Sequence, residues 1–157
     1  MELSRDLKDF LRLLTEHEVQ FMIVGAHAVA FHAFPRNTGD IDFWVRKSGE
    51  NAQRILDALE EFGFGSLGLT IDDLIDPNKV IQFGREPNRI DILTFLTGLE
   101  FDDCMVRAVS AMYEGIPVKV ISLDDLVANK KATGRDKDIL DVKEFERLGL
   151  VRNNVKD

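Results

Sequence analysis

Residues 19–45 read VQFMIVGAHAVAFHAFPRNTGDIDFWV, and this stretch decides the fold. The apolar run at its start is typical of a buried strand, and Gly25 allows a tight turn directly after it. The helix that follows should not continue past Phe34, because Pro35 comes next. The stretch therefore predicts four elements in succession: a strand over 19–24, a helix over 26–34, a loop over 35–39 and a strand over 40–45.

The second of these strands carries two carboxylates on one face. Successive side chains of a strand alternate between faces, so Asp40 and Asp42 project together. Two adjacent carboxylates repel each other unless a positive charge lies between them, and Mg²⁺ is the usual partner of such oxygen ligands. Asp91, in the Arg-Ile-Asp-Ile-Leu-Thr segment, is costly to bury unless it is paired or bound to a metal. The alternative is that Asp40 caps a turn while Asp42 and Asp91 lie on a solvated face.

The turn at Gly25-Ala26 would place the first N–H groups of a helix near these carboxylates. A helix N-terminus is a natural site for phosphate. A metal beside a phosphate cradle indicates chemistry on a nucleotide, with three carboxylates suited to two metal ions and an in-line displacement at phosphorus. In this interpretation Asp40, Asp42 and Asp91 hold metal, and Asp91 is also the base that activates the attacking hydroxyl.

The totals fit a soluble domain. The chain has 157 residues, a formal net charge of −8, 45% hydrophobic and 31% charged residues. We expect one domain over residues 1–150 and a frayed tail over 151–157. The negative charge argues against broad, nonspecific binding of nucleic acid. A single cysteine, Cys104, no signal-peptide core and no run long enough to span a membrane favour a cytoplasmic protein.

The rest of the chain supplies further helices and strands. Strands outnumber the intervening helices in the second half, so the sequence predicts an α+β fold with a mixed β-sheet flanked by helices rather than a fully parallel sheet. Residues 69–76 are ambiguous and could form a short helix. The predicted helices cover 3–17, 48–62, 123–133 and 136–148; the predicted strands cover 80–83, 89–94, 105–113 and 116–121, the last two as a hairpin.

The two closing helices place charges on their buried faces. Lys130 continues the apolar stripe of its helix, so it must either extend to the edge or reach an anion inside. Asp138 and Asp141 lie on the inner stripe of the next helix, where they either suit the helix dipole or orient Lys130, Arg135 or an acceptor. Arg135 and Lys137 could bind a triphosphate or simply be solvated.

Other residues have a structural interpretation that is at least as strong. Ser122 and Asp125 form a capping pattern. His27 and His32 are five residues apart, so they point in different directions and are better explained as core or surface histidines. Trp44 shares the face of Asp40 and Asp42, and we expect it to pack beneath a helix rather than stack on a base.

These motifs resemble those of a known superfamily. Gly25-Ala26, thirteen intervening residues and Asp40-Ile41-Asp42-Phe43 resemble the signature of the DNA polymerase β-like nucleotidyltransferases, and Asp91 stands where their third carboxylate would fall. More narrowly, the chain is similar to AbiEii-type and related minimal nucleotidyltransferases of toxin–antitoxin systems. The supporting motifs are Arg36-x-Thr38-x-Asp40-x-Asp42, Asp125-x4-Lys130 and Arg135-x-Lys137-Asp138-x-x-Asp141. The departures are Ala26, where the family usually has Ser or Gly, and a chain shorter than typical AbiEii-type toxins.

The resemblance implies an enzyme that uses Mg²⁺ or Mn²⁺ to move a nucleoside monophosphate from an NTP to a hydroxyl. The implied acceptor is a protein side chain, a tRNA end or a small molecule such as an aminoglycoside. A cognate toxin or antitoxin and a second copy of the chain are implied partners, and no membrane is. The alternatives are a non-catalytic nucleotide sensor or toxin-binding partner, and an antibiotic adenylyltransferase. The residues implied as nucleotide-binding are Gly25, Ala26, Arg36, Thr38, Lys130, Arg135, Lys137 and Asp138, with Lys130 also placed among the catalytic residues.

Overall fold

The computed structural model describes residues 4–34, 40–77, 79–84 and 89–152. Its centre is a six-stranded mixed sheet with the strand order β3-β4-β2-β1-β6-β5. The β2–β4 and β1–β6 pairs are parallel, and the other three pairs are antiparallel. The predicted α+β class with a mixed sheet is confirmed. The strands are β1 (Phe21–Val24), β2 (Asp40–Val45), β3 (Val80–Phe83), β4 (Arg89–Leu93), β5 (Val109–Tyr113) and β6 (Ile116–Val120).

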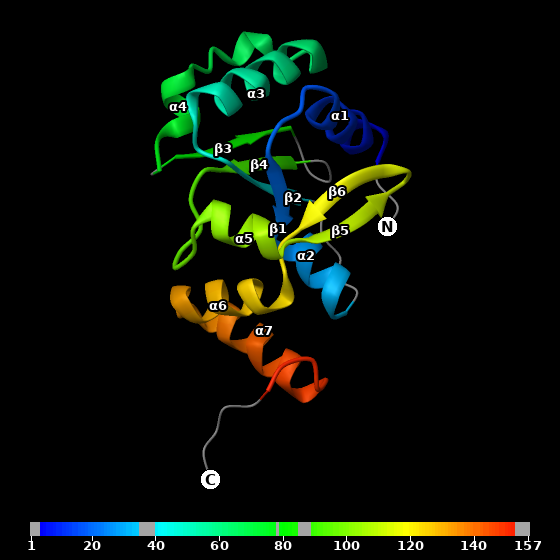
Figure 1. The fold of residues 1–157 in the computed structure, drawn as a ribbon, viewed down its shortest axis with the longest axis vertical. Coiled ribbons are helices and arrows are strands. Elements are labelled where there is room, and N and C mark those ends of the chain that lie inside the picture. The colour runs from blue at the N-terminus through cyan, green and yellow to red at the C-terminus, as the bar shows by residue number, and fades with distance from the viewer. Residues whose placement is uncertain (1–3, 35–39, 78, 85–88, 153–157) are drawn as a thin grey trace.

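Helices cover both faces of this sheet (Figure 1). The first three long helices and the two at the end of the chain agree with the predicted segments to within a few residues, and the ambiguous segment contains the short α4. The helices are α1 (Arg5–Glu16), α2 (Gly25–His32), α3 (Gly49–Phe62), α4 (Ile71–Ile75), α5 (Phe101–Arg107), α6 (Leu123–Thr133) and α7 (Asp136–Arg147), with a 3-10 turn η1 (Gly65–Leu67) after α3. Among the described residues, no helix is long and apolar enough to cross a membrane.

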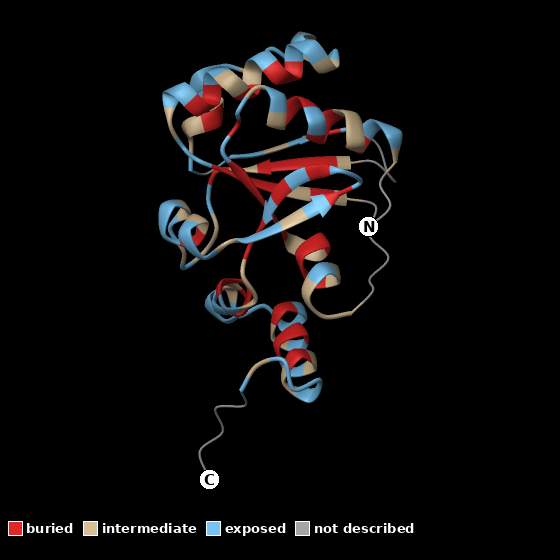
Figure 2. Ribbon diagram, turned by 45° about the vertical axis from the view of Figure 1, so that its right-hand side comes forward, coloured by how far each residue is buried: buried red, intermediate tan, exposed pale blue. Residues whose placement is uncertain are grey.

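The alternation of side chains on β2 divides the core into two layers. Phe43 faces α1, where its ring lies 5.8 Å from that of Phe10. Trp44 faces the opposite layer and meets Phe101 of α5 edge-on at 5.3 Å. The central strands β1, β2 and β4 are mostly buried, whereas the outer strands β3 and β5 are largely exposed (Figure 2). Trp44 is 1% exposed, so its predicted place beneath a helix is confirmed.

One predicted element is wrong. We expected a strand from Met105 to Tyr113, but residues up to Arg107 form α5 and the strand β5 begins only at Val109. The apolar pair Met105-Val106 is typical of a strand, yet α5 buries Cys104 completely and leaves Val106 86% exposed. A helix of seven residues is too short to show a clear 3.6-residue pattern, so burial of a single side chain decides its orientation.

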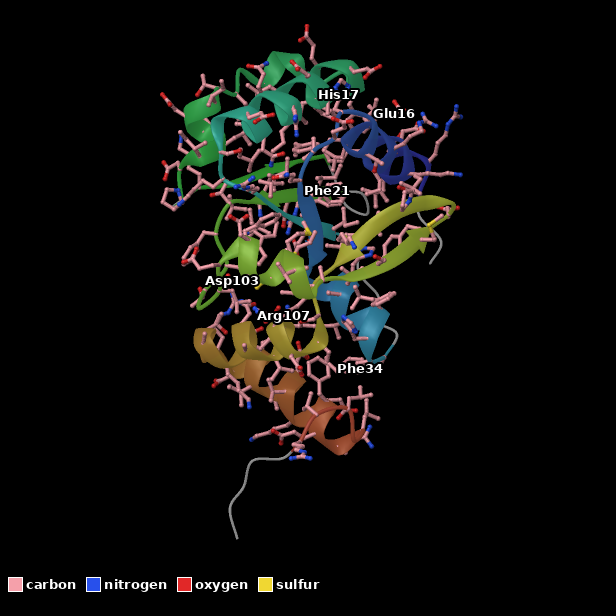
Figure 3. All side chains as sticks on the ribbon, in the orientation of Figure 1. Glu16, His17, Phe21, Phe34, Asp103 and Arg107 are labelled. Atoms are coloured by element: carbon pink, nitrogen blue, oxygen red, sulfur yellow. The ribbon has the colours of Figure 1, made fainter. Side chains whose placement is uncertain are left out.

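Two contacts fasten the C-terminal helix pair to the rest of the molecule. The ring of Phe34, after α2, lies 6.0 Å from that of Phe145 in α7. Arg107, at the end of α5, donates to both carboxylate oxygens of Asp125 in α6 at 3.0 and 3.1 Å. Figure 3 shows Phe34 and Arg107 directed toward these helices. Ser122 caps α6 by accepting from the Asp125 amide, which confirms that half of the capping pattern, while the Asp125 carboxylate is engaged by Arg107.

Candidate active site

Three carboxylates gather where β2 and β4 run side by side. In this parallel pair Asp42 is the register partner of Asp91, and Asp40 is the partner of Arg89. Paired residues lie on the same face of a sheet, so all three carboxylates share the layer of Trp44, as their sequence positions predict. We call Asp40, Asp42 and Asp91 the sheet carboxylates. Asp91 is buried, whereas Asp40 and Asp42 are half-buried.

The predicted turn lies directly beside them. Val24, the last residue of β1, is the register partner of Asp42, and Gly25 begins α2 with a φ of +67°. A Cβ at Gly25 would lie 2.1 Å from Asp42 Oδ2, closer than any real contact. Only glycine satisfies both the left-handed backbone and this approach. The first N–H groups of α2, at Gly25 and Ala26, therefore start next to the carboxylate of Asp42.

Of the residues that the structure describes, Arg89 is the cation paired with these groups, and it was not singled out from the sequence. Its Nη2 lies 2.6 Å from Asp40 Oδ2, and its Nε lies 3.3 Å from Asp91 Oδ1. The signal was present in the segment Arg-Ile-Asp, because residues two apart on a strand share a face. A basic residue two positions before a buried Asp is the natural counter-ion for it.

One guanidinium does not neutralise three carboxylates, and Asp42 bears the consequence. Burial, a hydrogen bond with Asp91 and repulsion from Asp91 and Asp40 raise the pKa of Asp42 from 3.8 to about 7, although the charge of Arg89 opposes the shift. Nearby, burial lowers the pKa of His27, and the charge of Asp40 partly offsets this effect. Within the described part of the chain, the sheet carboxylates therefore outnumber the cations that contact them.

The sheet carboxylates fit a hard divalent cation by their chemistry. All offer oxygen ligands, which Mg²⁺ prefers. Asp91 Oδ1 is buried and, among the described residues, accepts no hydrogen bond of good geometry. In this conformation, however, no three His, Cys, Asp or Glu side chains in the described part of the chain are arranged around one point where a metal could sit. The carboxylate oxygens and their charge are therefore suitable for a divalent cation, but Arg89 pairs with two of the three carboxylates.

Lys130 pairs with the two acidic residues of the next helix, Asp138 and Asp141. Its Nζ lies 2.8 Å from Asp141 Oδ2 and 3.3 Å from Asp138 Oδ1, and the three side chains are buried between α6 and α7. We call Lys130, Asp138 and Asp141 the lysine network. Of the two interpretations of the acidic pair, orientation of Lys130 matches these contacts. The role of Lys130 in phosphate binding and catalysis stays a prediction.

The basic residues of the Arg-x-Lys-Asp motif lie at the outer end of this network. Arg135 is mostly exposed and donates through Nε to Asp138 Oδ2 at 2.9 Å, while Lys137 is exposed on α7. Burial alone would raise the pKa of Asp138, but hydrogen bonds from Thr133 and Arg135 and the charge of Lys130 outweigh it and hold that pKa below its ordinary value. Arg36 and Thr38, predicted to meet phosphate, lie outside the described residues.

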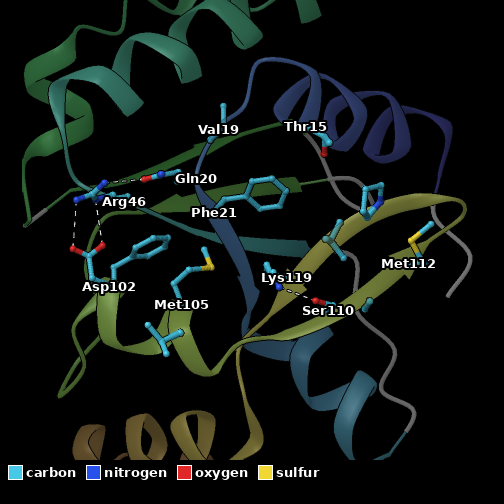
Figure 4. A pocket seen from close by; sticks show the side chains of 15 residues that line it. Thr15, Val19, Gln20, Phe21, Arg46, Asp102, Met105, Ser110, Met112 and Lys119 are labelled. Carbon is cyan, nitrogen blue, oxygen red and sulfur yellow. Dashed lines mark hydrogen bonds and ion pairs between the residues drawn. The ribbon is translucent and has the colours of Figure 1, made fainter.

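A large groove lies elsewhere on the molecule. It has a volume of about 710 Å³, is mainly apolar, and runs between α5 and the β5–β6 hairpin (Figure 4). Arg46 closes one end by bonding to Gln20 and to Asp102. Phe21 lines it at the start of β1, three residues before the end of the strand where Val24 meets Asp42. None of the sheet carboxylates lines this groove, so it is separate from the candidate active site.

Comparison with known proteins supports the fold and shows the family. A crystal structure titled as that of a "putative nucleotidyltransferase (TM1012)" from Thermotoga maritima matches with a TM-score of 0.59 and 14% identity over 92% of each chain. At this identity the likeness shows the fold. No protein of curated function matches the chain. The family match covers residues 3–155, nearly the whole sequence, and the chain therefore belongs to the family described as "Nucleotidyl transferase of unknown function (DUF2204)".

Proposed function

We propose that this chain is a metal-dependent nucleotidyltransferase, which moves a nucleoside monophosphate from an NTP to a hydroxyl and releases pyrophosphate. The observation that carries the proposal is the meeting of Asp42, Asp91 and Gly25 at one point, reached from three separate elements. A sheet stabilised for its own sake would not place a carboxyl with a raised pKa next to two others. The excess negative charge and the adjacent helix start suit a cation and a triphosphate.

In the proposed reaction, each residue has a limited task. Asp40, Asp42 and Asp91 would hold Mg²⁺ or Mn²⁺, which when bound would neutralise triphosphate charge and lower the pKa of the attacking hydroxyl. The backbone N–H groups of Gly25 and Ala26 would orient the phosphates. Asp91 would accept the proton of the acceptor hydroxyl. The acceptor oxygen forms a bond to the α-phosphorus, the bond from that phosphorus to the bridging oxygen breaks, and pyrophosphate leaves with that electron pair.

For the acceptor we retain three classes of hydroxyl: a protein side chain, a tRNA end and a small molecule such as an aminoglycoside. The AbiEii-type resemblance supports the first two and adds a cognate toxin or antitoxin as a proposed partner. The test is incubation with Mg²⁺ and ATP, CTP, GTP or UTP labelled at the α-phosphate, together with cell extract, purified tRNA or an aminoglycoside. The fraction that retains label identifies the acceptor class.

The control variants decide whether the sheet carboxylates perform the transfer. Asp42→Asn preserves size and removes the charge, so we expect label transfer to fall by about 10³-fold or more. Asp72→Asn changes an exposed carboxylate on α4 and should leave transfer unchanged. Equal transfer by wild type and Asp42→Asn would refute the assigned site. No transfer with any of the four nucleotides would instead favour a non-catalytic binding role for the fold.

A further inference from the structure

Arg89 contacts two of the three sheet carboxylates at once. It begins β4 and spans from Asp40 on β2, at 2.6 Å, to Asp91 on its own strand, at 3.3 Å. Its side chain is 35% exposed, whereas that of Asp91 is only 10% exposed. Arg89 is therefore the more solvent-accessible partner of its ion pair with Asp91.

A divalent cation and this guanidinium compete for the same oxygens. Mg²⁺ binds carboxylate oxygens at about 2.0–2.1 Å and requires near-octahedral geometry. With Arg89 in place, a metal on Asp40 and Asp91 would stand only a few ångströms from a second positive charge, which repels it. With Arg89 paired to Asp40 and Asp91, the sheet carboxylates of the described structure are adjacent but not arranged around one point.

We propose that Arg89 is a displaceable internal counter-ion. It neutralises Asp40 and Asp91 before a divalent cation binds, and the cation must displace it from them. Arg89 therefore sets the metal affinity of the site without being a metal ligand. This inference rests on the proposed function, since it assumes that the sheet carboxylates bind the metal.

Removing the positive charge should then have two opposite effects. Arg89→Gln leaves the buried Asp91 without its counter-charge, so the chain without divalent cations should unfold at a lower temperature than wild type. The same change removes the competitor, so Mn²⁺ should bind about tenfold more tightly. A purely structural ion pair would produce the first effect without the second. Arg89→Lys keeps the charge and should return the Mn²⁺ affinity toward that of wild type.

The experiment is calorimetric titration of the whole chain with Mn²⁺, accompanied by melting curves in EDTA and in excess Mn²⁺. Arg12→Gln is the matched control, because it removes one charge from an exposed position on α1 and should change neither quantity. We expect Arg89→Gln to bind Mn²⁺ more tightly than wild type does. The difference in melting temperature between the two proteins should be smaller in Mn²⁺ than in EDTA. If that variant is unfolded in EDTA, Mn²⁺ should restore its fold.

The possible failures have different meanings. Equal or weaker Mn²⁺ binding by Arg89→Gln, when wild type binds, would overturn the counter-ion role and leave the proposed function intact. Failure of Mn²⁺ to refold an unfolded Arg89→Gln would also overturn it. No Mn²⁺ binding by either protein would instead contradict the proposed metal site, and with it the proposed function.

Discussion

Two clusters of buried acidic side chains occur in this molecule, and they are balanced differently. In the lysine network, two carboxylates face the ammonium of Lys130, and Asp138 also accepts from Thr133 and Arg135. On the sheet, Arg89 pairs with Asp40 and Asp91, while burial and the neighbouring carboxylates raise the pKa of Asp42 to about 7. The first arrangement is closed by its own residues. Among the described residues, the second has more carboxylates than contacting cations, and on this difference we propose the sheet cluster, rather than the lysine network, as the active site.

The largest effect on stability should come from removing the charge of Lys130 from the lysine network. Lys130→Met would leave Asp138 and Asp141 buried without their shared counter-ion, so we expect a loss of about 3–5 kcal/mol in the free energy of unfolding. Urea denaturation measures it. Lys131→Met, at the exposed neighbouring position, is the control and should cost little. A loss below about 1 kcal/mol for Lys130→Met would show that the network is not structural and would revive a role for Lys130 at phosphate.

The next effect concerns the glycines that flank the two clusters. Gly25 and Gly134 have nearly the same φ, +67° and +65°. A Cβ added at Gly25 would clash with Asp42, whereas a Cβ added at Gly134 would have no atom within 4 Å. Alanine at Gly134 should therefore cost only the backbone strain, about 1–2 kcal/mol. Alanine at Gly25 should cost about 2–4 kcal/mol, because the clash with Asp42 is added. Equal losses in urea denaturation would contradict the close approach of Gly25 to that carboxylate.

A smaller effect is the pH dependence of stability in EDTA. Asp42 titrates at about 7 in the folded protein and near its ordinary value of 3.8 when unfolded. Between these values the folded state binds more protons, so the free energy of unfolding should fall as the pH rises through this range. Between pH 5 and 7.5, we expect the free energy of unfolding of Asp42→Asn to fall by about 1–2 kcal/mol less than that of wild type. Urea denaturation at both pH values measures this difference. The raised pKa of Asp42 would be contradicted if the free energy of unfolding changed equally with pH in wild type and in Asp42→Asn.

The sequence was informative where a local pattern determines the structure. Alternation on β2, the glycine after β1 and the cap at Ser122 could all be predicted, because each depends on neighbours a few residues away. The adjacency of Asp42 and Asp91 could be anticipated from the resemblance. Contacts between distant segments were harder to predict: the pairing of Arg107 with Asp125 was missed, and the contact of Lys130 with Asp138 and Asp141 was only one of two alternatives.

Arg89 lies between these two cases. Its place on the face of Asp91 follows from the two-residue period of a strand, but its contact with Asp40 needs the parallel pairing of β2 with β4. The helix α5 was missed for a related reason, since the burial of Cys104 depends on the core beneath it rather than on periodicity. Local patterns therefore predicted the carboxylates of the candidate site better than the cations around them.

The most direct test of the account is to measure Mn²⁺ binding at pH 8 by calorimetric titration of wild type, Asp42→Asn and Asp141→Asn. If the sheet carboxylates bind the metal and the lysine network does not, wild type and Asp141→Asn should bind Mn²⁺ with similar affinity. Asp42→Asn should bind at least about 100-fold more weakly, because a charged ligand is lost. Mn²⁺ binding that survives Asp42→Asn unchanged, or its absence from wild type, would contradict the central claim that this part of the sheet is a metal-dependent active site.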